Sequence, residues 1–242
     1  MQKLDSQDPV AVAVTDAIRG GHLPELRRLL DRYPGLASAR IVQEPREGCG
    51  GAGGRSLLHL ATDWPGHFPN GPQVVALLVR AGADPDARFA GAHAETPLHW
   101  AAGSNDVAVL DALIEAGADI EATGGVIGAG TPLADACGFG QWEAAHRLRG
   151  HGARVTLEDA ATLGLVGQVE EFLTGDEPPA ADEVTSAFWG ACHGGQLAVA
   201  RLLHAHGADV DRIGHGGARP VDIAAAQGAE DVVRWLRELG AE

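Results

Sequence analysis

The stretch ETPLHWAAGSNDVAVLDALIEAGAD, residues 95–119, recurs in altered form along the chain. Its relatives are GTPLADACGFGQWEAAHRLRGHGAR (130–154), TSAFWGACHGGQLAVARLLHAHGAD (185–209) and ARPVDIAAAQGAEDVVRWLRELGAE (218–242). Each copy predicts a short helix, a tight turn and a second amphipathic helix that stops at a glycine, where a left-handed backbone causes no Cβ clash. The distance from the threonine-like position to that glycine is constant, as from Thr96 to Gly117. One unit cannot bury its apolar face alone, so the constant spacing predicts stacked units.

The motif Thr96-Pro97-Leu98-His99 resembles the signature of the ankyrin-repeat family. Weaker versions stand as Ser56-Leu57-Leu58-His59 and Thr131-Pro132-Leu133-Ala134. The resemblance covers nearly the whole chain. It implies an all-α, ankyrin-like helix-turn-helix repeat solenoid with a concave groove, and we expect no long-range sheet. It also implies that His59 and His99 form hydrogen bonds to neighbouring turns.

The expected organisation is a single ankyrin-repeat domain, 1–242, of about seven units. These are a divergent N-terminal unit (10–40), regular units at 54–88, 94–123 and 129–155, a degenerate unit (156–175), a further unit (184–212) and a C-terminal cap (217–242). In the cap we expect exposed charged residues around Trp235, namely Asp231, Arg234, Arg237, Glu238 and Glu242.

The stretch DWPGHFPNG, residues 63–71, is an insertion between the two helices of the second unit. The turns at 86–95 and 121–130 are also longer than the architecture needs, and such loops usually carry function. We expect the insertion to close the N-terminal half of the groove. In that position Trp64, His67 and Phe68 should meet His93 and Glu95 from the next turn.

Residues suited to recognition or to acid–base chemistry gather on the face that the resemblance assigns to the groove. The candidate partner- or ligand-binding residues are Arg55, Trp64, Phe68, Phe89, Trp100, Val126, Ile127, Phe139, Trp142 and Trp189. The candidate acid–base residues are Asp63, His67, His93, Glu95, Asp135 and His193. Any single aromatic residue is more typical of core packing, whereas the whole collection favours a recognition surface.

Two classes of function fit these residues. The resemblance implies a binding module that recognises a partner, in most cases a protein, through the concave groove. The alternative is a small-molecule-binding protein or an isomerase, cyclase or hydrolase, with cofactor-independent acid–base catalysis in a pocket roofed by 63–71. The absence of a catalytic sequence motif favours the binding module. An enclosed cavity lined by the candidate residues would favour the alternative.

Charge and composition limit the other partners. The net charge of −15, from 18 Lys and Arg against 33 Asp and Glu, argues against nucleic acid and anionic membranes. No apolar stretch approaches the roughly 20 residues of a membrane span, and the N-terminus does not resemble a signal peptide. Three widely spaced cysteines, Cys49, Cys137 and Cys192, predict a reducing, cytoplasmic location. The glycine run 48–53 lacks the context of a dinucleotide site, and no ligand spacing predicts a metal, so we expect neither cofactor nor metal.

Overall fold

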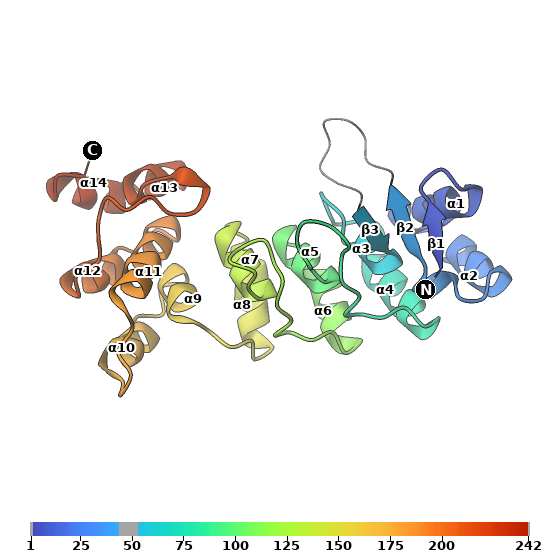
Figure 1. The fold of residues 1–242 in the computed structure, drawn as a ribbon, viewed down its shortest axis with the longest axis horizontal. Helices are drawn as coiled ribbons and strands as arrows, with labels where there is room; N and C mark the ends of the chain where they lie inside the picture. Colours follow the sequence, from blue (N-terminus) through green and yellow to red (C-terminus); the bar gives the residue numbers. More distant parts are fainter. Residues whose placement is uncertain (1, 44–52, 242) are drawn as a thin grey trace. The chain divides into compact units, whose positions relative to one another are not determined.

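The computed structural model describes residues 2–43 and 53–241, and these residues form a mostly helical fold with one small sheet (Figure 1). Consecutive helices pair through short turns. The helices are α1 (Pro9–Arg19), α2 (Leu23–Arg32), α3 (Leu57–Ala61), α4 (Gly71–Arg80), α5 (Pro97–Gly103), α6 (Val107–Glu115), α7 (Pro132–Gly138), α8 (Trp142–Gly150), α9 (Leu157–Thr162), α10 (Val166–Thr174), α11 (Ala181–His193), α12 (Leu197–Ala205), α13 (Pro220–Ala226) and α14 (Glu230–Glu238), with short 3-10 helices at Leu36–Ser38 and His215–Gly217. The expected all-α repeat fold is therefore confirmed.

The small sheet was not expected from the sequence. Its strands are β1 (Lys3–Asp5), β2 (Arg40–Gln43) and β3 (Gly53–Ser56). β1 pairs with β2 in parallel, and β2 pairs with β3 in antiparallel. The expectation of no long-range sheet is wrong, because the first helix pair lies between β1 and β2 in the chain. The β-branched residues of β2, Ile41 and Val42, favour an extended backbone.

The Thr-Pro-Leu-His motif acts through its first and last side chains. Thr96 caps α5, and the Nδ1 atom of His99 accepts the backbone N–H of Thr96 at 3.1 Å. The other ring nitrogen, Nε2, lies 3.1 Å from the carbonyl oxygen of Gly130 on the next turn. His59 repeats this arrangement, with Nε2 3.2 Å from the Glu95 carbonyl oxygen. The implied hydrogen bonds between neighbouring turns are present.

Both motif histidines are buried, and burial determines their charge. Removal from water lowers the pKa of His59 to about 3 and that of His99 to about 4, although a backbone hydrogen bond opposes the shift in each case. Both rings are therefore neutral at physiological pH. Each can accept a hydrogen bond at Nδ1 while it donates from Nε2.

The chain divides into two compact units, each with its own core. The N-terminal unit comprises Met1–Ala136 and Glu143–Ala153, and the C-terminal unit comprises Cys137–Trp142 and Arg154–Glu242. Buried leucines and alanines dominate both cores. Most of the second helices are followed by a left-handed glycine, for example Gly117 at φ 92°, whereas Gly175 at the end of α10 has an extended backbone.

The last helix pair is anchored by Trp235. Its buried ring meets Phe188 at 6.3 Å and His204 at 5.8 Å between ring centroids. The cap residues Asp231, Arg234, Arg237 and Glu238 are exposed, whereas Glu242 lies outside the described residues.

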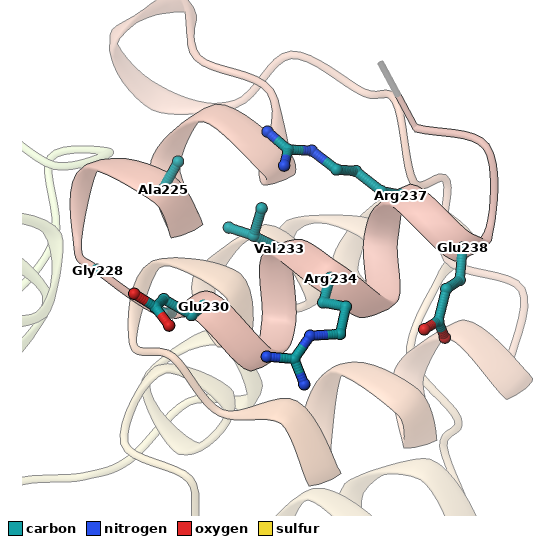
Figure 2. A pocket seen from close by; sticks show the side chains of 8 residues that line it. Ala225, Gly228, Glu230, Val233, Arg234, Arg237 and Glu238 are labelled. Carbon is teal, nitrogen blue, oxygen red and sulfur yellow. The ribbon is translucent and has the colours of Figure 1, made fainter.

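The last helix pair, α13 and α14, holds an open pocket of about 650 Å³. Figure 2 shows Arg234 and Arg237 on either side of Val233. The lining residues are Ala225, Gly228, Ala229, Glu230, Val233, Arg234, Arg237 and Glu238.

None of the described helices has the length and apolar character of a membrane span.

Candidate functional site

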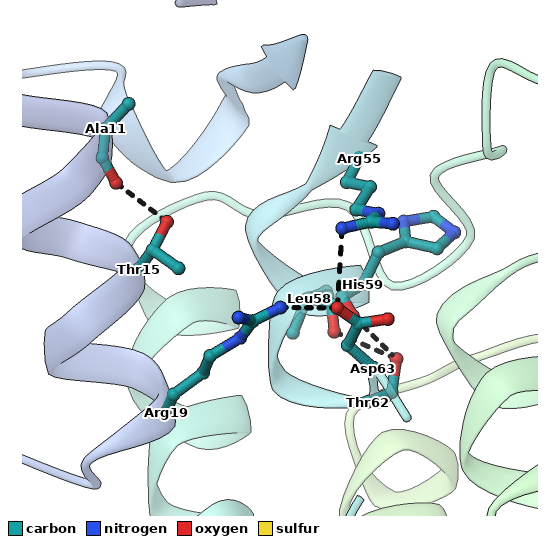
Figure 3. Close-up of polar contacts among 8 residues, drawn as sticks. All are labelled: Ala11, Thr15, Arg19, Arg55, Leu58, His59, Thr62 and Asp63. Atoms are coloured by element: carbon teal, nitrogen blue, oxygen red, sulfur yellow. Dashed lines mark hydrogen bonds and ion pairs between the residues drawn. The ribbon is translucent and has the colours of Figure 1, made fainter. Parts of the chain in front are cut away.

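Two arginines converge on one carboxylate in the N-terminal unit. Asp63 follows α3, and its Oδ2 atom lies 2.5 Å from Nη2 of Arg19 and 3.4 Å from Nη1 of Arg55 (Figure 3). Arg19 is the last residue of α1, and Arg55 lies on β3. The Asp63 side chain is 16% exposed, whereas those of Arg19 and Arg55 are 42% and 37% exposed. The cluster therefore joins the first two helix pairs and carries one positive charge in excess.

Aromatic residues continue this cluster toward the third helix pair. The Arg55 guanidinium lies over the ring of Trp100, 5.7 Å from its centroid. Trp100 meets His59 at 4.9 Å in an edge-on arrangement and Phe89 at 5.3 Å. Such cation–π and edge-to-face contacts are favourable, and together they hold the Trp100 indole in place. Trp100 therefore connects the charged cluster with the 86–95 turn.

Glu95 connects the same turn to Trp100 through its side chain. The carboxylate accepts a hydrogen bond from the Trp100 side chain, and the backbone oxygen accepts the N–H of Phe89 at 2.7 Å. Burial raises the pKa of Glu95, while an electrostatic interaction with His93 and the Trp100 hydrogen bond oppose the shift. His93 itself is exposed.

Asp135 is buried on α7 and holds the 121–130 turn. Its Oδ1 atom accepts the backbone N–H of Ile127 at 2.8 Å, and Oδ2 accepts that of Val126 at 3.3 Å. Burial raises the pKa of Asp135 to about 6, and the negative charge of Glu95 adds to the shift. Val126 is exposed and Ile127 half-buried. Both oxygens of Asp135 are engaged by backbone, which gives this carboxylate a structural task.

The inserted loop 63–71 is fixed to the helix pairs on both sides of it. On one side, the Asn70 amide donates to the carbonyl oxygen of Gly21 at 3.0 Å, in the turn between α1 and α2. On the other side, the backbone N–H of His67 donates to Oδ2 of Asp106 at 2.6 Å, in the turn between α5 and α6. Nε2 of His67 lies 3.2 Å from the Ser104 carbonyl oxygen. The loop thus spans three successive helix pairs.

The expected meeting of His67 with Glu95 and His93 is wrong. His67 lies against the turn that follows α5, whereas Glu95 precedes the N-cap of that helix. A helix of 7 residues separates the two ends by about 10 Å. The cause is Asp106, whose carboxylate binds the loop backbone, together with a left-handed φ of 56° at His67.

The loop side chains differ in their exposure. Trp64 is 76% exposed and His67 has a side-chain exposure of 62%, whereas Phe68 is half-buried. Tryptophan has one of the largest apolar side chains, and such side chains are usually buried. A tryptophan that remains exposed on a loop held by hydrogen bonds does not serve core packing and is typical of an interaction site. Trp64 is therefore the one loop aromatic that is open to a partner.

Four predicted residues, Phe139, Trp142, Trp189 and His193, belong to the C-terminal unit. The His193 ring lies 5.3 Å from that of Trp142 and 5.4 Å from that of Trp189, measured between ring centroids. The Trp189 indole donates to the Ala218 carbonyl oxygen at 2.9 Å, and both Trp189 and His193 are buried. Phe139 is exposed. The Trp189–His193 pair therefore packs the interior of its unit.

A smaller pocket, of about 220 Å³, lies beside Trp189. Its lining residues are Glu158, Thr185, Ser186, Trp189, Arg212, Ile213 and Gly214.

The remaining candidates concern cysteines, cofactors and metals. Cys49 and the glycine run, except Gly53, lie outside the described residues. Cys137 and Cys192 are free and buried, and burial raises the pKa of both thiols, to about 12 for Cys192. Such thiols are poor nucleophiles. In the described part of the chain, no group of three or more His, Cys, Asp or Glu residues could hold a metal ion.

Sequence reasoning missed Arg19, Ser104 and Asp106. For Arg19, the sequence did hold a signal, which appears when the repeats are aligned on the turn between their two helices. Gly21 and Asn105 occupy the same position of that turn, and both have a left-handed backbone, at φ 63° and 56°. Aligned on that turn, Arg19 falls at the end of the first helix, the position that Asp63 holds in the next pair. Two opposite charges at equivalent positions of adjacent repeats predict an ion pair.

Comparisons with protein families agree with this architecture. A family model described as ankyrin repeats (3 copies) matches residues 69–159, and another, described as ankyrin repeats (many copies), matches residues 189–237. Together they cover more than half of the 242 residues. A search of curated proteins gave no match.

Proposed function

The chain belongs to the ankyrin-repeat proteins, and we propose that it is a binding module whose partner is another protein. Repeats of this family generally mediate protein–protein interaction. We propose that the contact lies in the N-terminal unit, on a surface formed by Arg19, Arg55, Asp63, Trp64 and Trp100, called here the Trp64 surface.

The exposure of Trp64 is the observation that carries the proposal. A large aromatic side chain at 76% exposure offers apolar area to a partner without first breaking a packed core. Binding by a side chain on an already ordered loop loses little further conformational entropy. Tryptophan and arginine are also the residues most enriched at interface hot spots.

Charged side chains beside Trp64 add specificity to the apolar area that Trp64 offers. Arg19 and Arg55 flank Asp63, the residue that directly precedes Trp64. An aromatic anchor beside partly exposed charged groups is the usual arrangement of an interface, in which polar contacts surround an apolar centre. The row of contacts from Arg19 to Trp100 extends over the first three helix pairs.

A small-ligand or acid–base function is the second candidate. It is favoured by the raised pKa values of Glu95 and Asp135, since the charge of Glu95 contributes to the shift at Asp135. We favour protein binding because both oxygens of Asp135 already accept backbone N–H groups. In addition, the 63–71 loop is bound at the opposite end of α5 from Glu95 and so does not roof these carboxylates.

The proposal extends to the setting of the protein. We propose a cytoplasmic location, which suits the two free, buried cysteines. We propose that nucleic acid is not a partner, since a net charge of −15 opposes phosphate binding.

Affinity capture with matched variants tests the proposed function. Immobilised protein is exposed to a lysate of its own source cells, and captured proteins are identified by mass spectrometry. Trp64→Ala is compared with Ile213→Ala, because Ile213 is also strongly exposed, at 64%, but lies in the C-terminal unit. We expect a partner that wild type and Ile213→Ala retain and that Trp64→Ala loses, with all three melting alike. Equal capture by Trp64→Ala, or no capture by wild type, would contradict the proposal.

A further inference from the structure

The Trp64 surface carries two guanidinium groups for one carboxylate, and from this imbalance we infer that the partner presents an acidic side chain beside an apolar one. The acid contacts Arg19 and Arg55, and the apolar side chain packs on Trp64. The inference rests on the proposed function, because it specifies the chemistry of the protein segment that the module recognises.

The two arginines have donor capacity beyond their contact with Asp63. Each guanidinium has five N–H donors, and both reach the same oxygen, Oδ2, of Asp63. Both arginine side chains remain more than one-third exposed, while the carboxylate between them is mostly covered. A second carboxylate, supplied by a partner, fits this arrangement because guanidinium groups bind carboxylates in a charge-assisted and often bidentate manner.

The neighbouring strand strengthens the positive character of the site. Arg40 on β2 donates from Nη1 to the Gly54 carbonyl oxygen at 3.0 Å, directly before Arg55 in the chain. It places a third guanidinium on the adjoining strand of the same small sheet. A basic partner segment would meet repulsion here, so the site discriminates by charge as well as by shape.

The overall charge of the chain makes this local excess informative. A protein with a net charge of −15 repels acidic partners at long range. Recognition of an acid therefore depends on short-range contact with Arg19 and Arg55. Added salt screens both the long-range repulsion and the exposed ion pairs, so it tests the sum of the two effects and not the contact itself. Charge-changing variants are the sharper probe.

The loop that carries Trp64 lies next to the charged residues. Trp64 directly follows Asp63, and Pro69 of the same loop packs against Gly21, two residues beyond Arg19. The loop is thereby held beside the end of α1. A partner segment that places an acid and an apolar side chain next to each other, or one helical turn apart, can engage both groups.

Peptide selection followed by charge exchange tests the inference. A displayed library of random peptides is selected on the full-length protein, and peptides that Trp64→Ala fails to bind are retained. Their affinities are measured by fluorescence anisotropy for wild type, Arg19→Gln, Arg55→Gln and the control Arg234→Gln, an exposed arginine of the C-terminal unit. We expect an Asp or Glu close to a large apolar residue in every retained peptide. We also expect Arg19→Gln and Arg55→Gln each to bind about tenfold more weakly than wild type. The control Arg234→Gln should bind as tightly as wild type.

Charge exchange adds a gain of function that a folding defect cannot imitate. Changing the peptide acid to lysine should abolish binding to wild type and restore it to Arg55→Glu. Retained peptides without a common acid, or peptides that bind Arg19→Gln and Arg55→Gln as tightly as they bind wild type, would overturn the inference and leave the proposed protein-binding function intact. A library that yields no Trp64-dependent peptide would overturn both.

Discussion

Acid should destabilise the protein through the histidines of the Thr-Pro-Leu-His motif, and His99 allows this effect to be isolated. Its Nδ1 atom accepts the backbone N–H of Thr96, and Nε2 faces the Gly130 carbonyl oxygen. Protonation of Nδ1 would place a charge in a buried site and remove the acceptor. The folded protein therefore binds this proton only near pH 4, whereas the ordinary pKa is 6.5.

The sign and size of the effect follow from these two values. Because the folded pKa is lowered, the unfolded chain binds the proton first as the pH falls, and stability is lost below about pH 6.5. Between about pH 7.5 and pH 5 the loss from His99 alone is about 2 kcal/mol, since one pKa unit corresponds to about 1.4 kcal/mol. His59, with its pKa lowered to about 3, should lose a similar amount over this range.

Urea unfolding of His99→Gln at the two pH values measures this contribution. The variant should be less stable at neutral pH, because it loses the geometry of the cap and of the turn-to-turn hydrogen bond. Its further loss on acidification should be about 2 kcal/mol smaller than that of wild type. His146→Gln, which changes an exposed histidine, should behave as wild type. Equal acid sensitivity of His99→Gln and wild type would refute the reasoning.

Three further predictions concern the cap, a buried carboxylate and the inserted loop. Deleting 218–242 should give an aggregating product in light scattering, because it uncovers Phe188; a soluble and equally stable truncation would contradict this. In urea unfolding, Asp135→Asn should gain about 1 kcal/mol relative to wild type between about pH 5 and pH 8, because a raised carboxyl pKa makes wild type lose stability as the pH rises; a constant difference would exclude the shift. Asp106→Ala should cost at least about 1 kcal/mol more than Asp8→Ala, since both residues cap a helix but only Asp106 also binds the loop; equal costs would show that the loop is not anchored there.

The repeat architecture could be predicted because its determinants are local. A threonine cap, a histidine three residues later and a glycine after the second helix recur at constant spacing, and each has one structural task. The roles that the ankyrin-repeat resemblance implied for His59 and His99 are confirmed by their hydrogen bonds. Phe89 and Trp100, both named as candidate binding residues, lie in adjacent units, and their rings meet at 5.3 Å between centroids.

The sheet and the destination of the loop could not be predicted because both depend on partners distant in the chain. β1 pairs with β2 across a whole helix pair, and nothing in the three residues Lys3–Asp5 signals that pairing. The direction of the 63–71 loop is decided by the carboxylate of Asp106, 39 residues away from His67. Similarly, Trp189 was expected on a surface, but its ring is buried beside His193.

The anchoring of the loop to Gly21 and Ser104 bears on how this repeat array can change during evolution. Repeat arrays lengthen and shorten by whole units because each unit contacts only its neighbours. The loop belongs to the second helix pair and binds both of its neighbours, so its position depends on having the first pair on one side and the third on the other. Gain or loss of a unit between Gly21 and Asp106 would separate the two anchors and release Trp64 from its fixed position. Unit exchange should therefore be tolerated in the later repeats and excluded from the first three.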